Sequence, residues 1–188
     1  MKIIIRVLLL LAVAALPVQA KEIAGITMPA TLDADGVTLK LNGAGIRTMV
    51  FMDIYVGGLY LESPGHDAEK IIMADEPMAM RLHMVSGMIT SEKMEDATMD
   101  GFKLSLGNDI KSMEGPIDNF LSVFREPISE GDVFDIIWIP GKGVDVNKNG
   151  TFKGTTTDGG LPFKQALWRI WLGKEPVHKK LKAAMLGK

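Results

Sequence analysis

The sequence lacks cysteine altogether, which excludes disulfide bonds, thiol nucleophiles and thiolate metal sites. Histidine is scarce as well. His66, His83 and His178 lie far apart, and none has a second metal-binding side chain at a useful spacing. We therefore expect no metal site. Without disulfides or a metal, the fold has to depend on its apolar core, which a chain of this length is able to bury.

Clustered basic charge and a phosphate-binding loop are also missing. The chain has 21 lysines and arginines against 23 acidic residues, and no basic block. This balance gives no electrostatic basis for nucleic-acid binding. Gly43-Ala44-Gly45 is only a fragment of a dinucleotide-binding loop, because a third glycine is absent. We expect neither a nucleic-acid partner nor a cofactor.

A long apolar run occurs only near the N-terminus. Lys2 and Arg6 precede an uncharged apolar run over residues 7–16. Val18-Gln19-Ala20 then supplies small residues at the two positions where a signal peptidase requires them. The run is shorter than the roughly 20 residues that a membrane-spanning helix needs. The pattern predicts a cleavable signal peptide, with an uncleaved membrane anchor as the alternative.

Cleavage after residue 20 implies a periplasmic or secreted protein that begins near Lys21. Residues 21–188 have the length of one domain and show no internal repeat or linker. Losing Lys2 and Arg6 leaves 19 basic and 23 acidic residues, a net charge of −4. We predict a single domain over 21–188 with no membrane span after cleavage. The sequence does not indicate an oligomeric state.

Hydrophobic periodicity predicts strands early, helices in the middle and at the end, and a hairpin between them. Strands are expected at residues 26–32, 37–41, 46–55, 56–62, 78–85, 133–139, 144–148 and 151–155, and helices at 68–73, after Thr90 or Ser91, after Pro116, over 162–173 and after Pro176. Asn42-Gly43-Ala44-Gly45 has the composition of a tight loop. The order favours an α+β fold, a largely antiparallel sheet with helices on one face.

Residues 145–150 resemble the start of a calcium loop, but two features argue against one. The twelfth position of such a loop requires a glutamate and is Thr156 here, and the flanking residues alternate as strands do. Asn149-Gly150 is instead the dipeptide that a two-residue β-hairpin favours. A hairpin is therefore the preferred interpretation.

Arg47 is the first candidate for a ligand-binding side chain. Strand alternation would put it on the same face as Asp53 and Tyr55. An inward-pointing arginine needs an anion, and the guanidinium fork suits a carboxylate. That carboxylate could belong to a ligand or to Asp53, and both possibilities remain open. The methionines, 12 of which follow residue 20, suggest an adaptable apolar pocket nearby.

Five segments together resemble the chalcone isomerase-like family. They are Leu41–Arg47, Phe51 with Tyr55–Glu62, Ser91–Met94, Phe120–Glu126 and Trp171–Pro176. The resemblance implies an open-faced β-sandwich with a ligand cleft between a long antiparallel sheet and a helical layer. It also implies one of two roles, since plant enzymes of the family cyclise chalcones to flavanones, whereas other members lack this activity and bind fatty acids.

The family's site residues can be compared with this sequence position by position. The arginine that holds the reacting phenolate falls on Arg47 and is kept. A threonine falls on Tyr55, which still has a hydroxyl, and a tyrosine falls on Thr90. An asparagine falls on Ala97 and a threonine or serine on Ile170, which cannot form hydrogen bonds through their side chains. The anion-binding half of the site is retained, and the flavonoid-orienting half is not.

Three functional hypotheses follow. The first is a non-catalytic protein that binds a small amphipathic acid such as a fatty acid, with Arg47, Tyr55 and Thr90 as ligand-binding residues. The second is an isomerase or lyase in which Arg47 stabilises an oxyanion; no other catalytic residue is proposed. The third is an envelope scaffold or interaction protein with a vestigial cleft, in which Arg47 forms an ion pair with Asp53.

Overall fold

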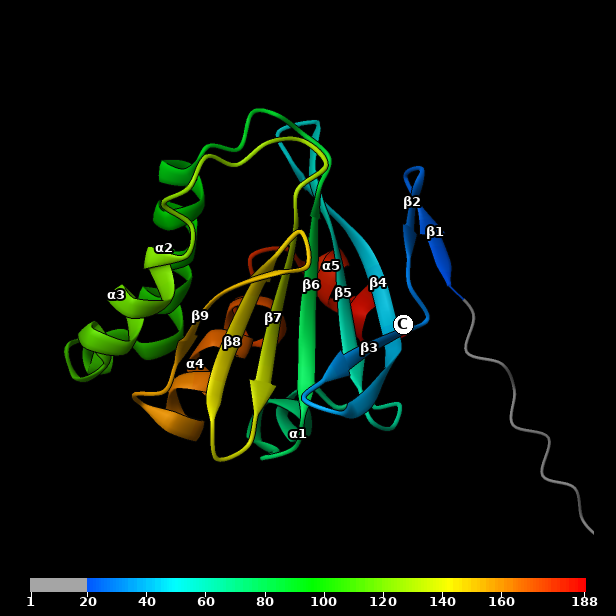
Figure 1. The fold of residues 1–188 in the computed structure, drawn as a ribbon. Coiled ribbons are helices and arrows are strands. Elements are labelled where there is room, and N and C mark those ends of the chain that lie inside the picture. Colours follow the sequence, from blue (N-terminus) through cyan, green and yellow to red (C-terminus); the bar gives the residue numbers. More distant parts are fainter. Residues whose placement is uncertain (1–19) are drawn as a thin grey trace, which may run out of the picture.

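The computed structural model describes residues 20–188, so the predicted signal peptide lies outside the described residues except for Ala20. A seven-stranded antiparallel sheet forms the centre of the fold, and its strands follow one another in chain order (Figure 1). These strands are β3 (Thr31–Ala34), β4 (Val37–Met49), β5 (Met52–Leu61), β6 (Met78–Met84), β7 (Val133–Ile139), β8 (Gly143–Lys148) and β9 (Thr151–Thr156). The hairpin of β1 (Lys21–Ile23) and β2 (Ile26–Met28) forms a second, two-stranded sheet.

The helices cover one face of the large sheet and enclose the larger of two apolar cores. They are α1 (Ala68–Met73), α2 (Ser91–Leu106), the 3-10 helix η1 (Gly107–Met113), α3 (Glu114–Ser122), α4 (Gly160–Leu172) and α5 (Lys179–Met185). The smaller core lies on the other face, where Met28 of the β1–β2 hairpin is buried in one cluster with Ala44 and Val56. The predicted α+β fold is confirmed.

β6 shows the alternation that the sequence predicted. Met80 and Leu82 are buried in the larger core. Arg81 points to the other face and forms two hydrogen bonds with Asp135 of β7, at 2.6 and 2.7 Å. A guanidinium that meets both carboxylate oxygens fixes the pairing of these two strands more firmly than a single contact would.

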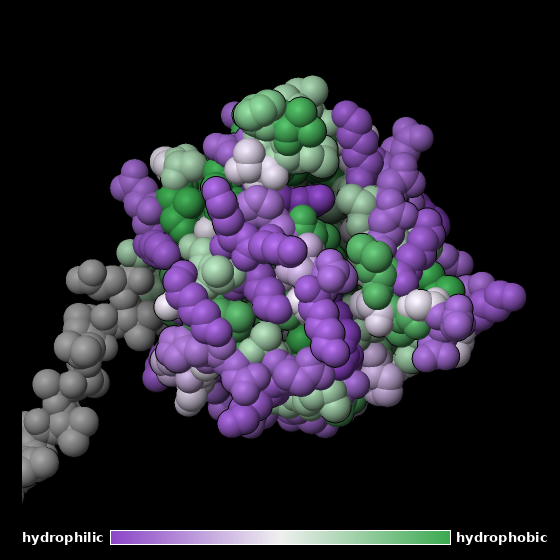
Figure 2. Space-filling model, turned by 180° about the vertical axis from the view of Figure 1, so that it is seen from behind, coloured by the Kyte–Doolittle hydropathy of each residue, from purple (hydrophilic) through white to green (hydrophobic). Residues whose placement is uncertain are grey.

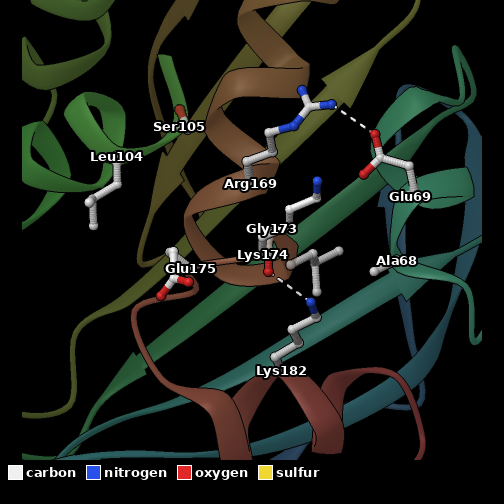
Figure 3. Close-up of a pocket in the computed structure, with 10 residues that line it drawn as sticks. Ala68, Glu69, Leu104, Ser105, Arg169, Gly173, Lys174, Glu175 and Lys182 are labelled. Carbon is white, nitrogen blue, oxygen red and sulfur yellow. Dashed lines mark hydrogen bonds and ion pairs between the residues drawn. The ribbon is translucent and has the colours of Figure 1, made fainter. Parts of the chain in front are cut away.

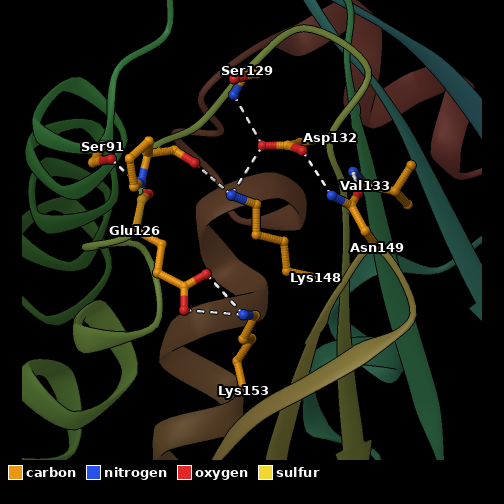
Figure 4. Close-up of polar contacts among 9 residues, drawn as sticks. Ser91, Glu126, Ser129, Asp132, Val133, Lys148, Asn149 and Lys153 are labelled. Atoms are coloured by element: carbon orange, nitrogen blue, oxygen red, sulfur yellow. Dashed lines mark hydrogen bonds and ion pairs between the residues drawn. The ribbon is translucent and has the colours of Figure 1, made fainter.

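The predicted hairpin at Asn149-Gly150 is confirmed, and it belongs to a polar network shown in Figure 4. Lys148 lies 3.0 Å from Asp132, and the side chain of Asn149 donates to the same carboxylate at 2.7 Å. Burial by itself would raise the pKa of Asp132, but these contacts and the Ser129 amide outweigh it and hold the pKa below its usual value. The network joins the segment before β7 to the β8–β9 hairpin.

The prediction of a tight loop at Asn42–Gly45 was wrong. These residues continue β4, with a register shift between Leu41 and Gly43. The glycines serve close packing instead of a turn. A Cβ atom on Gly43 would overlap the carbonyl oxygen of Ala184, and one on Gly45 would lie 2.6 Å from the Ala184 Cβ. Helix α5 can therefore lie directly on β4 only because these side chains are missing.

The continuous strand predicted over residues 46–55 was also wrong, because the chain reverses at Val50-Phe51. Both residues have left-handed backbones, with φ of 45° and 68°, and Met49 pairs with Met52 across the two-residue loop. Such a turn prefers Asn-Gly. Left-handed backbone costs other L-residues about 1–2 kcal/mol each, and a β-branched valine is especially unsuited to it.

The buried face of α2 and the start of α5 differ from what the sequence patterns predict. Met94, Gly101 and Leu104 have the spacing of one apolar helix face in α2, but Leu104 is 67% exposed, and the helix buries Thr98 and Phe102 together with Met94 and Gly101. The last helix begins at Lys179, three residues beyond Pro176, because His178 caps its N-terminus by accepting from the Leu181 amide.

Candidate ligand-binding site

A small cavity lies between the sheet and the helical layer. Most of its lining is apolar and comes from β5 to β7 and from α2, α3 and α4. The polar groups in the lining are Arg47, Tyr55, Thr98 and Trp171. An apolar enclosure with a few polar groups at defined positions is the usual composition of a small-molecule site.

Arg47 and Tyr55 face each other across the β4–β5 pairing. They occupy opposite positions in the two strands, and the Arg47 Cζ atom lies 5.5 Å from the centre of the Tyr55 ring. The indole of Trp171, on α4, donates to the Tyr55 hydroxyl at 2.8 Å. Two strands and one helix thus hold the phenol in a fixed position.

The Tyr55 side chain is only 2% exposed, and burial raises its pKa, although Arg47 and the Trp171 hydrogen bond partly oppose this effect. The phenol is therefore neutral at physiological pH. Its oxygen already accepts from Trp171, while its own proton has no acceptor among residues 20–188. Tyr55 is left with one hydrogen bond to donate into the cavity.

Arg47 has no carboxylate partner in the part of the chain that the structure describes. Asp53 accepts instead from the Thr48 hydroxyl at 2.9 Å, because a bulge at Ile54 interrupts the alternation that would have brought it to Arg47. The Arg47–Asp53 ion pair of the scaffold hypothesis is thus absent. Burial, together with the charges of Arg47 and Lys180, lowers the pKa of His178, which favours its neutral form. The site therefore carries an uncompensated positive charge.

The cavity is nearly closed, with a volume of about 10 Å³. That is room for about one water molecule. A much larger depression lies elsewhere, at the C-terminal end of α4, with about 870 Å³ (Figure 3). Two of its cations already have partners, since Arg169 pairs with Glu69 at 2.9 Å and Lys182 donates to the Gly173 carbonyl at 2.7 Å. The depression is more open to solvent than the cavity and is bordered by five charged side chains, so the smaller cavity is the better candidate for an apolar ligand.

The structure brings together some of the predicted site residues. Arg47 and Tyr55 meet in the cavity, and Ala97 and Ile170 also line it. Thr90 does not line it. This residue is exposed and caps α2 by accepting from the Lys93 amide at 3.3 Å. A role for Thr90 in binding remains a prediction. Trp171 was not predicted as a site residue, although a tryptophan in a helix that is apolar on most sides usually needs a partner for its indole N–H.

Two further features were searched for among residues 20–188, a group of metal-binding side chains and a membrane-spanning helix. Residues 20–188 contain no group of three or more acidic, histidine or cysteine side chains that could hold a metal ion. Within the same residues, no helix has both the length and the apolar character needed to cross a membrane.

Replacing Trp171 with phenylalanine should show how much the indole contributes to positioning Tyr55. The substitution keeps most of the buried volume and removes one hydrogen bond to a buried oxygen. We expect the free energy of unfolding to fall by about 1–2 kcal/mol, measured by urea denaturation. Trp138→Phe is the control, because Trp138 is also buried and its indole makes a longer hydrogen bond to Asp75, at 3.2 Å. Equal losses in both variants would argue against a special role for the Trp171–Tyr55 contact.

Comparison with known proteins places this geometry in a family. No curated protein sequence matches the chain. Among solved structures, a fatty-acid binding protein from Arabidopsis thaliana superposes with a TM-score of 0.70 and 19% sequence identity, over 86% of this chain and 92% of that chain. This likeness establishes a shared fold. The sequence itself matches the chalcone isomerase-like family over residues 20–187, nearly all of the described chain. The protein belongs to the chalcone isomerase-like family.

Proposed function

We propose that this protein binds a small amphipathic acid, such as a fatty acid, in the cavity beside Arg47 and does not act on it chemically. The observation that carries the proposal is an arginine without a counter-ion next to a buried phenol with an unused proton. Both lie at one end of a cavity whose other walls are mainly apolar. The charge at one end and the hydrocarbon lining at the other match the two ends of a fatty acid.

The polar end would bind the carboxylate with two kinds of donor. The Arg47 guanidinium supplies charge and N–H groups, and the Tyr55 hydroxyl supplies a neutral hydrogen bond. Trp171 holds that hydroxyl in place without competing for its proton, because the indole is a donor only. A charge-assisted hydrogen bond of this kind contributes about 1.5–3 kcal/mol.

The apolar end has to open before a hydrocarbon tail can enter a cavity of about 10 Å³. The sheet wall is held by hydrogen bonds to neighbouring strands, so the helical wall is the side expected to move. Met94 of α2 lines the cavity there, and its unbranched side chain can adopt other rotamers without strain. Binding would thus shift the protein toward an open form that is a minor species without ligand.

Two further points support binding over catalysis. The Arabidopsis protein of the same fold is named for binding fatty acids. In addition, Ala97 and Ile170 line the cavity where the resemblance to chalcone isomerases leads us to expect polar side chains. The cavity thus lacks two of the side chains by which, on that resemblance, a flavonoid would be oriented through hydrogen bonds. The predicted signal peptide would place this binding in the periplasm or outside the cell.

Arg47→Ala should weaken fatty-acid binding about 10- to 100-fold, because it removes the charged partner of the carboxylate. Ligands that copurify with the wild-type protein are first identified by mass spectrometry, and their affinity is then measured by titration calorimetry. A fatty alcohol of the same chain length is titrated alongside the acid. The preference of the wild type for the acid should largely disappear in the variant.

Arg125→Ala is the matched control, since Arg125 is exposed and lies outside the cavity lining. Its affinity for the acid should equal that of the wild type. Unchanged binding in Arg47→Ala would contradict the proposal. So would turnover of a chalcone that is lost in Arg47→Lys, because lysine keeps the charge and loses the fork. That result would favour the isomerase hypothesis.

A further inference from the structure

The turn between β4 and β5 presents an unusual apolar tip. Met49, Val50, Phe51 and Met52 follow one another in the sequence and are 44%, 78%, 101% and 37% exposed. Their side chains have no core to enter, because the hairpin extends beyond the rest of the sheet. Figure 2 shows hydrophobic side chains gathered at the top of the molecule, the end at which this hairpin turns.

Neither local folding nor packing accounts for these residues. Both central positions of the turn have left-handed backbones, where asparagine and glycine are favoured and a valine is strained. Exposed apolar side chains add nothing to the core. The tip thus combines a conformational cost with a solvation cost, and such local conflicts with folding preferences concentrate at functional positions.

The shape of the tip fits a lipid surface better than a folded protein partner. Four side chains on a narrow hairpin expose on the order of a few hundred Å², whereas a stable protein interface buries about 800 Å² per partner. A convex apolar tip of this size can instead enter the interface of a bilayer.

The charged residues near the tip, and the position of the tip next to Arg47, also favour a lipid surface. Helix α5 runs along β4, and its first residues, Lys179 and Lys180, are exposed near Arg47, whose charge acts on the neighbouring His178. Asp53 is the exposed carboxylate beside the tip, and it accepts from Thr48. Arg47 itself is two residues from Met49, so the polar end of the cavity lies within about 10 Å of the tip.

We propose that residues 49–52 insert into the surface of a lipid bilayer and bring the Arg47 end of the cavity to the membrane, where amphipathic acids reside. The choice of a lipid surface rests in part on the proposed function, because a protein that binds fatty acids gains access to them there. The basic residues of α5 would favour anionic headgroups.

The test is flotation of the mature protein, which begins near Lys21 after the predicted cleavage, with vesicles of phosphatidylcholine, with and without phosphatidylglycerol. In the double variant Val50→Asn/Phe51→Gly the turn receives the residues that its backbone prefers, so this variant should fold with an equal or higher Tm. Its vesicle partitioning should fall by about tenfold or more. Leu104→Ser is the matched control: it removes another exposed apolar side chain, which lines the depression near α4, and should leave partitioning unchanged.

Affinity for a soluble short-chain fatty acid, measured without vesicles, separates this proposal from the proposed function. The double variant should retain it. If the wild type does not float, or if the double variant floats equally well, the tip proposal fails whatever the fatty-acid affinity. If vesicles bind but the fatty acid does not, the proposed function fails and the tip proposal stands. A dimer of the wild type that the double variant abolishes without vesicles would assign the tip to a second copy and overturn the lipid proposal.

Discussion

Gly45→Val is expected to lower the free energy of unfolding by about 3 kcal/mol, because β4 has no room for a side chain beneath helix α5. A Cβ atom at this position would lie 2.6 Å from the Ala184 Cβ and 3.5 Å from the Leu181 Cδ1. Valine adds two further methyl groups at the same contact. Either the helix moves away from the strand, or the new valine and Leu181 leave their preferred rotamers. Urea denaturation measures the loss as a lower midpoint at an unchanged slope.

Gly154→Val is the matched control. Gly154 also lies within a strand, β9, but a Cβ atom there would meet only the Val123 Cγ1, at 3.7 Å. Since valine favours strands, this variant should be as stable as the wild type or slightly more stable. Ala184→Gly should restore part of the stability lost in Gly45→Val, because it removes the nearest atom. Equal stability of the two valine variants would contradict the packing argument.

The same contact explains why the sequence pattern at residues 42–45 was misread. Glycine is permitted in turns and also where two backbones approach closely, and the sequence alone does not separate these uses. The distinguishing information is tertiary. Helix α5, about 140 residues further along the chain, approaches β4, and the Asn42 side chain donates to the Met185 carbonyl at 2.8 Å. No local pattern around Asn42 indicates that contact.

At Val50-Phe51 the sequence pattern predicts a strand, whereas the structure has a turn. An apolar, partly β-branched run predicts a strand, and nothing in it signals a turn. The structure overrides this local preference because the pairing of β4 with β5 on either side requires a reversal there. A turn built from unsuitable residues is a position where sequence reasoning should fail, and the membrane proposal gives these residues a role.

Arg47 was singled out as a charged residue in an apolar strand, and Tyr55 by the family resemblance. Both line the cavity together with Ala97 and Ile170, whereas Thr90 does not. The family resemblance locates residues of the cavity lining because they keep their order in the chain, even where local propensities predict the wrong secondary structure. It did not identify the closed state of the cavity, which depends on how the α2 and α3 side chains fill the space. It also did not identify the buried lysine of α4.

Lys164→Met is expected to cost about 3–5 kcal/mol of folding free energy, the largest loss we expect from a single substitution. Lys164 is fully buried, and its ammonium donates to the carbonyls of Ile71, Ile72 and Ala74 at 2.8, 2.9 and 2.8 Å. These groups belong to the end of α1, where helix carbonyls have no partners within the helix. Methionine keeps the apolar stem and leaves three buried acceptors without a donor.

The pH dependence of the free energy of unfolding tests the contribution of Lys164 independently. Burial lowers the pKa of Lys164 from 10.5 to about 8, with Asp75 and Glu76 opposing the shift. Between these two values the unfolded chain binds more protons than the folded one, so this group stabilises the fold increasingly as pH rises, by about 1 kcal/mol per unit. Lys164→Met lacks the group. The stability difference between wild type and variant should therefore widen from pH 8 to pH 10, whereas Lys40→Met, at an exposed position, should differ little from the wild type throughout. A difference that stays constant over this range would show that the lysine remains charged in the fold and contributes through its three hydrogen bonds alone.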